Sequence, residues 1–531
     1  MKRRTWIVSA LMYALVFAAC IGVLHIMDRL MEPEQQEMVA SGQESGGAAS
    51  KANAQESTVP ALETEGNLAG EADILPTVVD TSEQNAKDEI KRETGYKSWK
   101  KTVASAWNPE PEAEPYKPPK VILATDLHYL SAASHDDGQA FQTFVEHSDG
   151  KVTQYLPQLL EAFIDQVIEE RPSALILSGD ITMNGERVGH EELAEKLSRV
   201  KEAGIPVLVI PGNHDINNPN AASYFGEEQE AAPTVDTEEF YEIYGDCGYD
   251  EAISRDENSL SYVYKLDEKN WLLMLDSCQY EPKNLVEGRI REETLAWADE
   301  QLEKAAEAGI CVLPVAHHNL LAQSRMYTTQ CAMENNGEVI ELLQKYKLPL
   351  FLSGHLHVQR MRKHKSEPGV PDEEYGIEEI ITDAISIPPC QYGVLQWRED
   401  GSMEYETRSV DVSSWAQKNG IEDENLLDFE TWSYEYLQRL ISAQIRGVIK
   451  NLGEDAESSM AAAYAGVYID YYAGRRIDVQ GVRSSVGYRW WQRNMPDSYL
   501  MRELEAMMAD SDRDNNYLLL PEAAGIQGSL Y

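Results

Sequence analysis

Residues 120–128 read Lys-Val-Ile-Leu-Ala-Thr-Asp-Leu-His, and this stretch decides the fold prediction. Its first part is a short continuous apolar run, which is typical of a strand buried on both faces. The run ends at Asp126 and His128, which are two residues apart and on an extended chain point in the same direction. The two side chains are therefore able to bind one ion together.

Four more apolar runs along the chain end in similar clusters of Gly, His, Asp or Asn. Amphipathic stretches lie between the runs, which is the βα alternation of a layered α/β domain. Because ligands in such folds bind at the carboxyl ends of the strands, we expect the clusters to converge on one edge. The runs are 174–178 before Gly179-Asp180, 206–211 before Gly212-Asn213-His214-Asp215, 311–316 before His317-His318, and 348–353 before Gly354-His355-Leu356-His357.

The predicted edge gathers carboxylates, imidazoles and one amide, without a thiolate. This mixed set of oxygen and nitrogen donors suits two divalent ions such as manganese, iron or zinc. Two ions that share a carboxylate can activate a water and stabilise both the attacking and the leaving oxygen of a displacement at phosphorus. Any one cluster could be an ordinary turn, but five in this order predict a metal-dependent phosphoester hydrolase.

The five clusters together resemble the signature of the calcineurin-like metallophosphoesterases. The resemblance covers roughly residues 118–412 and implies a four-layer αββα sandwich with a dinuclear metal centre in a catalytic domain at 116–412. It also implies roles for individual residues. One ion would be held by Asp126, His128 and His357, the other by Asn213, His317 and His355, with Asp180 bridging; His214 would protonate the leaving oxygen or hold the phosphate, and Asp215 would orient His214.

Two departures from common family patterns refine this prediction. Protein phosphatases of the superfamily continue Gly-Asp with x-x-Asp-Arg-Gly, whereas residues 179–186 read Gly-Asp-Ile-Thr-Met-Asn-Gly-Glu. This version is similar to the bacterial cyclic-nucleotide phosphodiesterase branch. His317 is preferred to His318 as a ligand because it occupies the usual position in His-His-Pro versions of the motif, although Asn319 replaces the proline here.

The N-terminal part predicts a membrane anchor and a stalk. Residues 6–27 are almost continuously apolar and follow Lys2, Arg3 and Arg4, so they can span a bilayer with the following chain outside the cytoplasm. A cleaved signal peptide and lipoprotein processing at Cys20 are the alternatives to an uncleaved transmembrane anchor at 1–30. Residues 31–115 are rich in Glu, Ala, Ser, Gly and Gln, which predicts a disordered acidic stalk.

Residues 413–531 are predicted to form a small helical C-terminal domain. Aromatic and aliphatic residues recur at helical spacing from Phe429 to Leu452 and from Met460 to Tyr471, and a third helix is expected over 496–509. The aromatic residues could line a groove for a base or sugar, but packing in a core is the more common role of such a stripe. Asp510-x-Asp512-x-Asp514 resembles a calcium loop without its glycine and its final Glu, and predicts a capping or solvated loop instead.

The charge of the chain limits its partners. The 531 residues include 46 Lys and Arg against 90 Asp and Glu, which gives a formal net charge of −44. Such a surface repels a long nucleic acid, whereas two divalent ions reverse the sign locally and still allow a small phosphoester substrate to bind. An envelope phosphomonoesterase, a nucleotide pyrophosphatase and a non-catalytic binding module on the same fold remain the alternatives.

Overall fold

The computed structural model describes residues 116–322, 324–326, 330–364 and 376–521, and from Pro118 onward these belong to one compact unit. The predicted membrane span at 6–27 and the predicted stalk at 31–115 lie outside the described residues. Within the described ranges, no helix has the length and apolar character needed to cross a membrane.

The first of two large sheets contains the strand formed by residues 120–124. Strand β1 lies between β13 and β2, and β3 follows β2 in parallel. All residues of β2 and β3 are buried, as expected for strands covered on both faces. In spatial order the six strands are β15 (Tyr517–Leu520), β14 (Met403–Ser409), β13 (Gln391–Trp397), β1 (Lys120–Ala124), β2 (Ala174–Ser178) and β3 (Val207–Ile210).

The second sheet has seven strands and contains the other two predicted runs. Strands β8, β9 and β10 are parallel at its centre, whereas β11 and β7 pair antiparallel with their neighbours. In spatial order the strands are β11 (Arg360–Lys363), β12 (Glu378–Ile381), β10 (Leu350–Ser353), β9 (Cys311–Ala316), β8 (Asn270–Leu275), β7 (Tyr262–Lys265) and β6 (Ser254–Arg255). A separate hairpin pairs β4 (Ala222–Phe225) with β5 (Glu228–Ala231).

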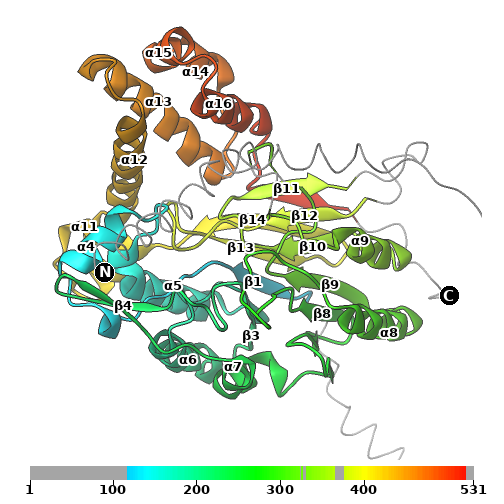
Figure 1. Cartoon of the computed structure of the whole chain (residues 1–531). Helices are drawn as coiled ribbons and strands as arrows, with labels where there is room; N and C mark the ends of the chain where they lie inside the picture. The colour runs from blue at the N-terminus through cyan, green and yellow to red at the C-terminus, as the bar shows by residue number, and fades with distance from the viewer. Residues whose placement is uncertain (1–115, 323, 327–329, 365–375, 522–531) are drawn as a thin grey trace, which may run out of the picture. The chain divides into compact units, whose positions relative to one another are not determined.

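The two sheets share one apolar core and carry helices on their outer faces. Side chains from β1, β2, β10 and β12 meet in a single buried cluster, to which α5 (Leu156–Glu170) and α6 (Arg187–Glu202) contribute. A second cluster joins α8 (Glu292–Ala308) and α9 (Asn336–Lys345) to β8, β9 and β10. Figure 1 shows the two helix pairs well apart with the strands between them, so the fold is a layered α/β sandwich.

The remaining helices of the catalytic part are short. Helices α4 (Gln139–Glu146) and α7 (Thr237–Tyr244) each have eight residues. Asp236 caps α7 by accepting a hydrogen bond from Glu239 N at 2.9 Å, which satisfies one of the free amides at the helix start. Neither helix was anticipated from the sequence.

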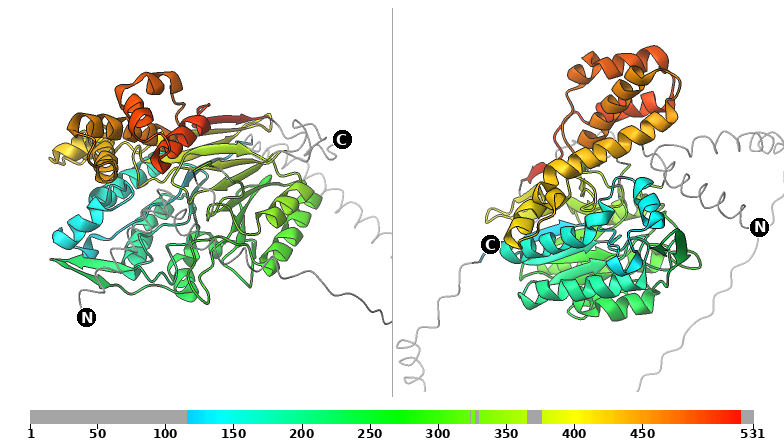
Figure 2. Two further views of the ribbon diagram at one scale, coloured as in Figure 1. Left: turned by 45° about the horizontal axis from the view of Figure 1, so that its top comes forward. Right: turned by 90° about the vertical axis from the view of Figure 1, so that its left-hand side faces the viewer.

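The C-terminal part is helical, and its aromatic residues pack. Tyr464, Tyr468, Tyr471 and Trp491 are buried in one cluster with four methionines, so these four side chains form part of a core rather than the wall of a groove. Figure 2 shows these helices in yellow-orange to red, packed against one another. They are α10 (Val412–Lys418), α11 (Glu424–Leu427), α12 (Phe429–Val448), α13 (Glu454–Tyr472), α14 (Val479–Ser484), α15 (Val486–Asn494) and α16 (Tyr499–Asp510).

One feature of this part differs from the expected all-helical domain. After α16 the chain returns to the first sheet, where β15 pairs with β14. Asp510, from the predicted loop motif, is buried and accepts a hydrogen bond from Arg325 N at 2.9 Å, with the guanidinium groups of Arg360 and Arg362 each 3.6 Å away. The carboxylate of Asp510 therefore ties the helical part to the second sheet.

Candidate metal centre

The predicted ligand residues come together where the strands of both sheets end. The clusters converge as expected, and they do so from both sheets, because β1, β2 and β3 belong to the first sheet while β9 and β10 belong to the second. Backbone hydrogen bonds fix the loops to one another: Asp126 N donates to Gly179 O at 3.0 Å, and Gly354 N donates to His317 O at 3.0 Å. The sandwich thus brings two sets of strand ends to one site.

One half of the site is formed by Asp126, His128 and His357 with Asp180, and is called the His357 half below. One ligand atom from each of the four residues lies within 4.8 Å of the others. His357 Nε2 is 3.0 Å from His128 Nε2 and 3.3 Å from Asp126 Oδ1. His128 Nε2 is 3.9 Å from Asp180 Oδ2. These atoms converge as the ligands of a single ion would.

The other half, called the His317 half, is formed by Asn213, His317 and His355, again with Asp180. His317 Nε2 is 3.2 Å from Asn213 Oδ1 and 3.3 Å from the same Asp180 oxygen that faces His128. His355 lies beside His317, with 5.2 Å between the ring centroids. Asp180 Oδ2 therefore stands between the two halves, where a bridging ligand is needed.

The backbone is bent at the ligand positions. Twelve described non-glycine residues have positive φ, and five of them are predicted ligands: Asp126, His128, Asp180, His355 and His357. This conformation costs energy for side chains with a Cβ and concentrates at functional sites. Gly354 precedes two of these residues, and a Cβ there would lie 2.0 Å from Thr125 Oγ1. The close approach of the two sheets at the site therefore requires glycine.

The donor atoms fit a pair of divalent ions. Asp126 Oδ2 accepts hydrogen bonds from Thr125 Oγ1 at 2.8 Å and His355 N at 3.0 Å, whereas Asp126 Oδ1 is buried without any hydrogen bond. The nearest charged partner of this oxygen is the His357 ring, with Nε2 at 3.3 Å, and an ion between the two would satisfy the buried carboxylate. Carboxylate, imidazole and amide donors in this number suit manganese, iron or zinc.

The electrostatics of the site keep its central carboxylate ionised. Burial disfavours charge on Asp180, but His317 and His214 outweigh burial and hold the pKa of Asp180 well below its ordinary value. Burial also disfavours charge on His317, yet Asp180 raises the pKa of His317 to about 9. Burial and the neighbouring His317 lower the pKa of His355 to about 4, so that its ring is neutral at pH 7.

His318 differs from His317 in the partners of its ring. His318 Nδ1 is 2.8 Å from Ser277 Oγ and His318 Nε2 is 3.0 Å from Val286 O. Both nitrogens of His318 thus meet protein groups, whereas His317 Nε2 faces Asp180 and Asn213. His317, His318 and His355 each have a ring nitrogen within 4.8 Å of the others, but the partners already present at both His318 nitrogens favour His317 as the ligand.

His214 is held so that one ring nitrogen faces the site. His214 Nδ1 is 2.8 Å from Met183 O and 3.0 Å from Asn184 Oδ1. Because both partners are acceptors, Nδ1 carries a proton. His214 Nε2 is then 4.0 Å from Asp180 Oδ2, on the side of the metal site.

Asp215 has a different contact from the one predicted. Its carboxylate accepts hydrogen bonds from Gly212 N at 2.8 Å, Thr182 N at 2.9 Å and Thr182 Oγ1 at 2.8 Å, and not from the His214 ring. Asp215 therefore joins the loop after β2 to the loop after β3. The expectation that it orients His214 directly is corrected: Met183 and Asn184 do so.

Several residues that support the site were missed from the sequence. Glu379 is fully buried and accepts from Leu320 N and Leu321 N, both at 2.7 Å, just after the His317 cluster. Asn319 donates to Gly354 O at 2.8 Å, which links the loops after β9 and β10. Asn319 replaces the family proline, and only that departure drew attention to it; nothing in the sequence marks Glu379.

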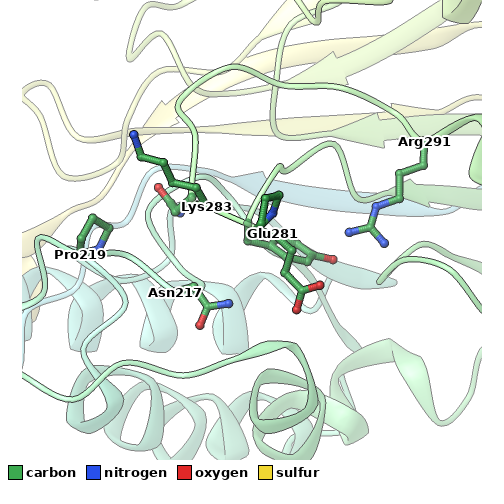
Figure 3. Close-up of a pocket in the computed structure, with 8 residues that line it drawn as sticks. Asn217, Pro219, Glu281, Lys283 and Arg291 are labelled. Carbon is green, nitrogen blue, oxygen red and sulfur yellow. The ribbon is translucent and has the colours of Figure 1, made fainter.

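An open pocket lies next to the His317 half. It has a volume of about 960 Å³, and Figure 3 shows Lys283 and Arg291 on opposite sides of it with Glu281 and Asn217 between them. Asn284 also lines the pocket and donates to Asn213 O at 2.8 Å and Ile216 O at 2.9 Å. Asn284 thus joins the wall of the pocket to the loop that carries the predicted ligand Asn213.

Comparison with known proteins gives two family matches. Residues 119–359 match the calcineurin-like phosphoesterase family, and residues 411–514 match the C-terminal domain of cyclic nucleotide phosphodiesterase. A dimetal phosphatase from Danio rerio is similar in structure with 15% identity and a TM-score of 0.41, covering 55% of this chain and 97% of that one. A purple acid phosphatase from yellow lupin has 15% identity and a TM-score of 0.38, covering 56% of this chain and 53% of that one. No curated protein matches the chain.

Proposed function

Residues 119–359 belong to the calcineurin-like phosphoesterase family and the chain is a metallophosphoesterase, and from this premise we propose that it hydrolyses a small phosphodiester such as a cyclic nucleotide. The observation that carries the proposal is the position of Asp180 between the two ligand halves, with its Oδ2 atom 3.9 Å from His128 Nε2 and 3.3 Å from His317 Nε2. One carboxylate oxygen shared by two sets of ligands is the arrangement that a two-metal hydrolase needs.

The residues of the chain divide the work of the reaction. Asp126, His128 and His357 would hold one ion, Asn213, His317 and His355 the other, and Asp180 both. Two ions in these positions supply Lewis acidity to the phosphoryl group and to the attacking water. The carboxylates and the imidazole rings would fix the positions of the ions, and five of these ligand residues have positive φ.

His214 would serve the leaving group. Its Nδ1 proton is shared between Met183 O and Asn184 Oδ1 in hydrogen bonds, so only Nε2 is available to the substrate. The His214 side chain is 31% exposed, in contrast to the fully buried ring of His317, and can therefore reach a bound ester. A protonated Nε2 would donate its proton to the departing oxygen, as a general acid does.

Two observations support a diester with an organic leaving group. Residues 411–514 match a family described as the C-terminal domain of cyclic nucleotide phosphodiesterase, and that description includes a diester substrate. The pocket beside Asn213 has space for a group as large as a nucleoside, and its two cations, Lys283 and Arg291, outnumber its one carboxylate, Glu281, in a chain of net charge −44. A small anionic ester would therefore be attracted to this pocket.

The location outside the cytoplasmic membrane is part of the same proposal. It is supported by the apolar residues 6–27 and by the basic residues that precede them. Protease added to intact cells should remove the catalytic part while a cytoplasmic marker survives. Protection of the catalytic part in intact cells, with digestion after lysis, would refute this location.

The activity is tested with the full chain and added Mn²⁺. Bis-p-nitrophenyl phosphate, p-nitrophenyl phosphate and cyclic nucleotides should be compared at equal concentration, and we expect the diesters to turn over faster. Faster turnover of the monoester would instead identify a phosphomonoesterase, and cleavage restricted to nucleoside diphosphates a pyrophosphatase. Absence of all hydrolysis with two ions bound would indicate a non-catalytic binding module.

A further inference from the structure

The loop 148–151 reaches the metal centre from outside the five predicted clusters. Its residue Asp149 places Oδ2 3.2 Å from His357 Nδ1. The opposite nitrogen of that ring, Nε2, faces His128 and Asp126. A ligand histidine commonly has a carboxylate at its outer nitrogen, which fixes the ring orientation and makes the ring a stronger ligand. Asp149 stands in that position.

Lys151 keeps the Asp149 carboxylate in place. Lys151 Nζ lies 2.7 Å from Asp149 Oδ1 and 2.6 Å from Asp149 Oδ2. Among the described residues, Lys151 is the only buried lysine, with 8% of its surface exposed. A buried ammonium group is tolerated only when paired. The pair therefore fixes one rotamer of Asp149 within a narrow space.

Helix α12 of the C-terminal part holds the loop through its backbone. Tyr436 Oη donates to Lys151 O at 3.2 Å, and Gln444 Nε2 donates to Ser148 O at 3.1 Å. These two contacts lie on either side of Asp149 in sequence. Helix α12 therefore determines where the carboxylate stands relative to His357.

Packing against α12 also explains the residue at position 150. Gly150 has φ +115°, and a Cβ on it would lie 2.6 Å from Leu437 Cδ1. A side chain at this position would strain the backbone and displace the side chain of Leu437. On its other side the loop is fixed by Val152 N, which donates to Ser386 O at 2.9 Å, while Ser386 Oγ donates to Asp126 O at 2.8 Å. The loop is thus clamped between α12 and the metal centre.

We propose that Asp149 is a positioning residue for His357 and that α12 sets its position, so that the C-terminal part tunes the ion held by Asp126, His128 and His357. The proposal rests on the proposed function in taking His357 as a metal ligand. It gives the helices after residue 411 a defined task at the active site. Asp149 touches neither substrate nor ion in this scheme and acts only through the His357 ring.

The test is a calorimetric titration of the metal-depleted full chain with Mn²⁺, which needs no substrate. Asp149→Asn keeps the shape of the side chain and removes its charge, and we expect it to weaken one of the two ions by about 10- to 100-fold while the other keeps its affinity. Asp149→Glu should restore part of the loss. Tyr436→Phe should weaken the same ion by a smaller factor.

Tyr434→Phe is the matched control, because Tyr434 is on the same helix but 40% exposed. It should leave both ion affinities unchanged. Wild-type isotherms for both Asp149→Asn and Tyr436→Phe would overturn the proposal, as would equal weakening of both ions. If the unaltered chain hydrolyses no ester, the proposed function fails, whereas these isotherms still decide the role of Asp149.

Discussion

The two halves of the metal centre have similar ligands but different supports. In the His317 half, the outer nitrogens meet backbone carbonyls: His317 Nδ1 is 2.9 Å from Ser178 O, and His355 Nε2 is 2.9 Å from Gln330 O. In the His357 half, the outer nitrogen meets the side chain of Asp149, whose loop is held by a helix almost 300 residues further along the chain. The rings of the first half are therefore supported by backbone carbonyls, and the His357 ring by a charged side chain on a loop that the C-terminal part holds.

Removing Asp180, the ligand that the two halves share, should affect metal binding in both halves. Asp180→Ala takes away the oxygen that faces both His128 and His317, so we expect loss of both ions and of all metal-dependent hydrolysis. The loss should exceed the roughly 10- to 100-fold effect of an outer hydrogen-bond partner. Metal content measured by mass spectrometry after gel filtration checks this.

Asp180→Asn serves as the conservative variant, because it keeps an oxygen without the full negative charge. It should weaken both ions to a similar degree. Two tightly bound ions per chain in Asp180→Ala would contradict the bridging role. Loss of one ion alone would show that Asp180 belongs to a single half.

His214→Ala should separate catalysis from metal binding in both halves. The His214 ring is anchored by Met183 O and Asn184 Oδ1, and the bond from His214 N to Asp180 Oδ1 at 2.7 Å is a backbone contact that alanine keeps, so both ions should bind as before. Loss of a general acid lowers kcat by about 10²- to 10⁴-fold. The loss should be smaller for p-nitrophenyl esters, whose leaving oxygen needs little protonation, than for a ribose leaving group.

The control for this variant is His147→Ala, an exposed histidine at the end of α4. It should leave kcat and metal content unchanged. An equal loss of kcat for good and poor leaving groups would contradict proton donation by His214. A role in holding the phosphate would then account for the loss.

The pH dependence of metal binding should be the same in the two halves despite their different supports. Each half contains one histidine whose pKa is about 9, His317 in one and His357 in the other. For His357, burial and Lys151 disfavour the charged ring, but Asp126 raises the pKa. Both rings are therefore protonated at neutral pH before an ion binds and must lose that proton to become ligands.

The affinity for Mn²⁺ should rise with pH, because a higher pH removes the proton that competes with the ion. Between pH 6 and 8 the Mn²⁺ affinity of each half should rise by about tenfold per pH unit. Calorimetry in buffers of different ionisation enthalpy counts the protons released, and one per ion is expected. Release of no protons, or a falling affinity with rising pH, would contradict the assignment of these two rings as ligands.

Much of the centre was predictable because it consists of local patterns. Each ligand cluster directly follows an apolar run, and the runs at 174–178 and 311–316 coincide with β2 and β9. The distribution of the strands over two sheets was not predictable from these patterns, since strand order depends on contacts between distant segments. The supports were hidden for the same reason. Ser148-Asp149-Gly150-Lys151 reads as a polar turn, and only the contact with α12 gives it a role.

The smallest expected effect concerns the support of the His317 half from the pocket side. Asn284 Nδ2 donates to Asn213 O and Ile216 O, and a hydrogen bond of this kind contributes about 1 kcal/mol, or roughly a fivefold change in an equilibrium constant. Asn284→Ala should therefore weaken the ion of the His317 half by about fivefold and leave the ion of the His357 half unchanged, which is the reverse of the pattern for Asp149→Asn.

Lys283→Ala is the matched control, because Lys283 directly precedes Asn284 and lines the same pocket. Lys283 lines the pocket and has no role here in holding a loop that carries a metal ligand. Its loss should therefore raise KM for an anionic diester and leave the affinities for both ions unchanged. Weakening of the His357 ion by Asn284→Ala would show that the two halves are coupled through Asp180 rather than supported separately.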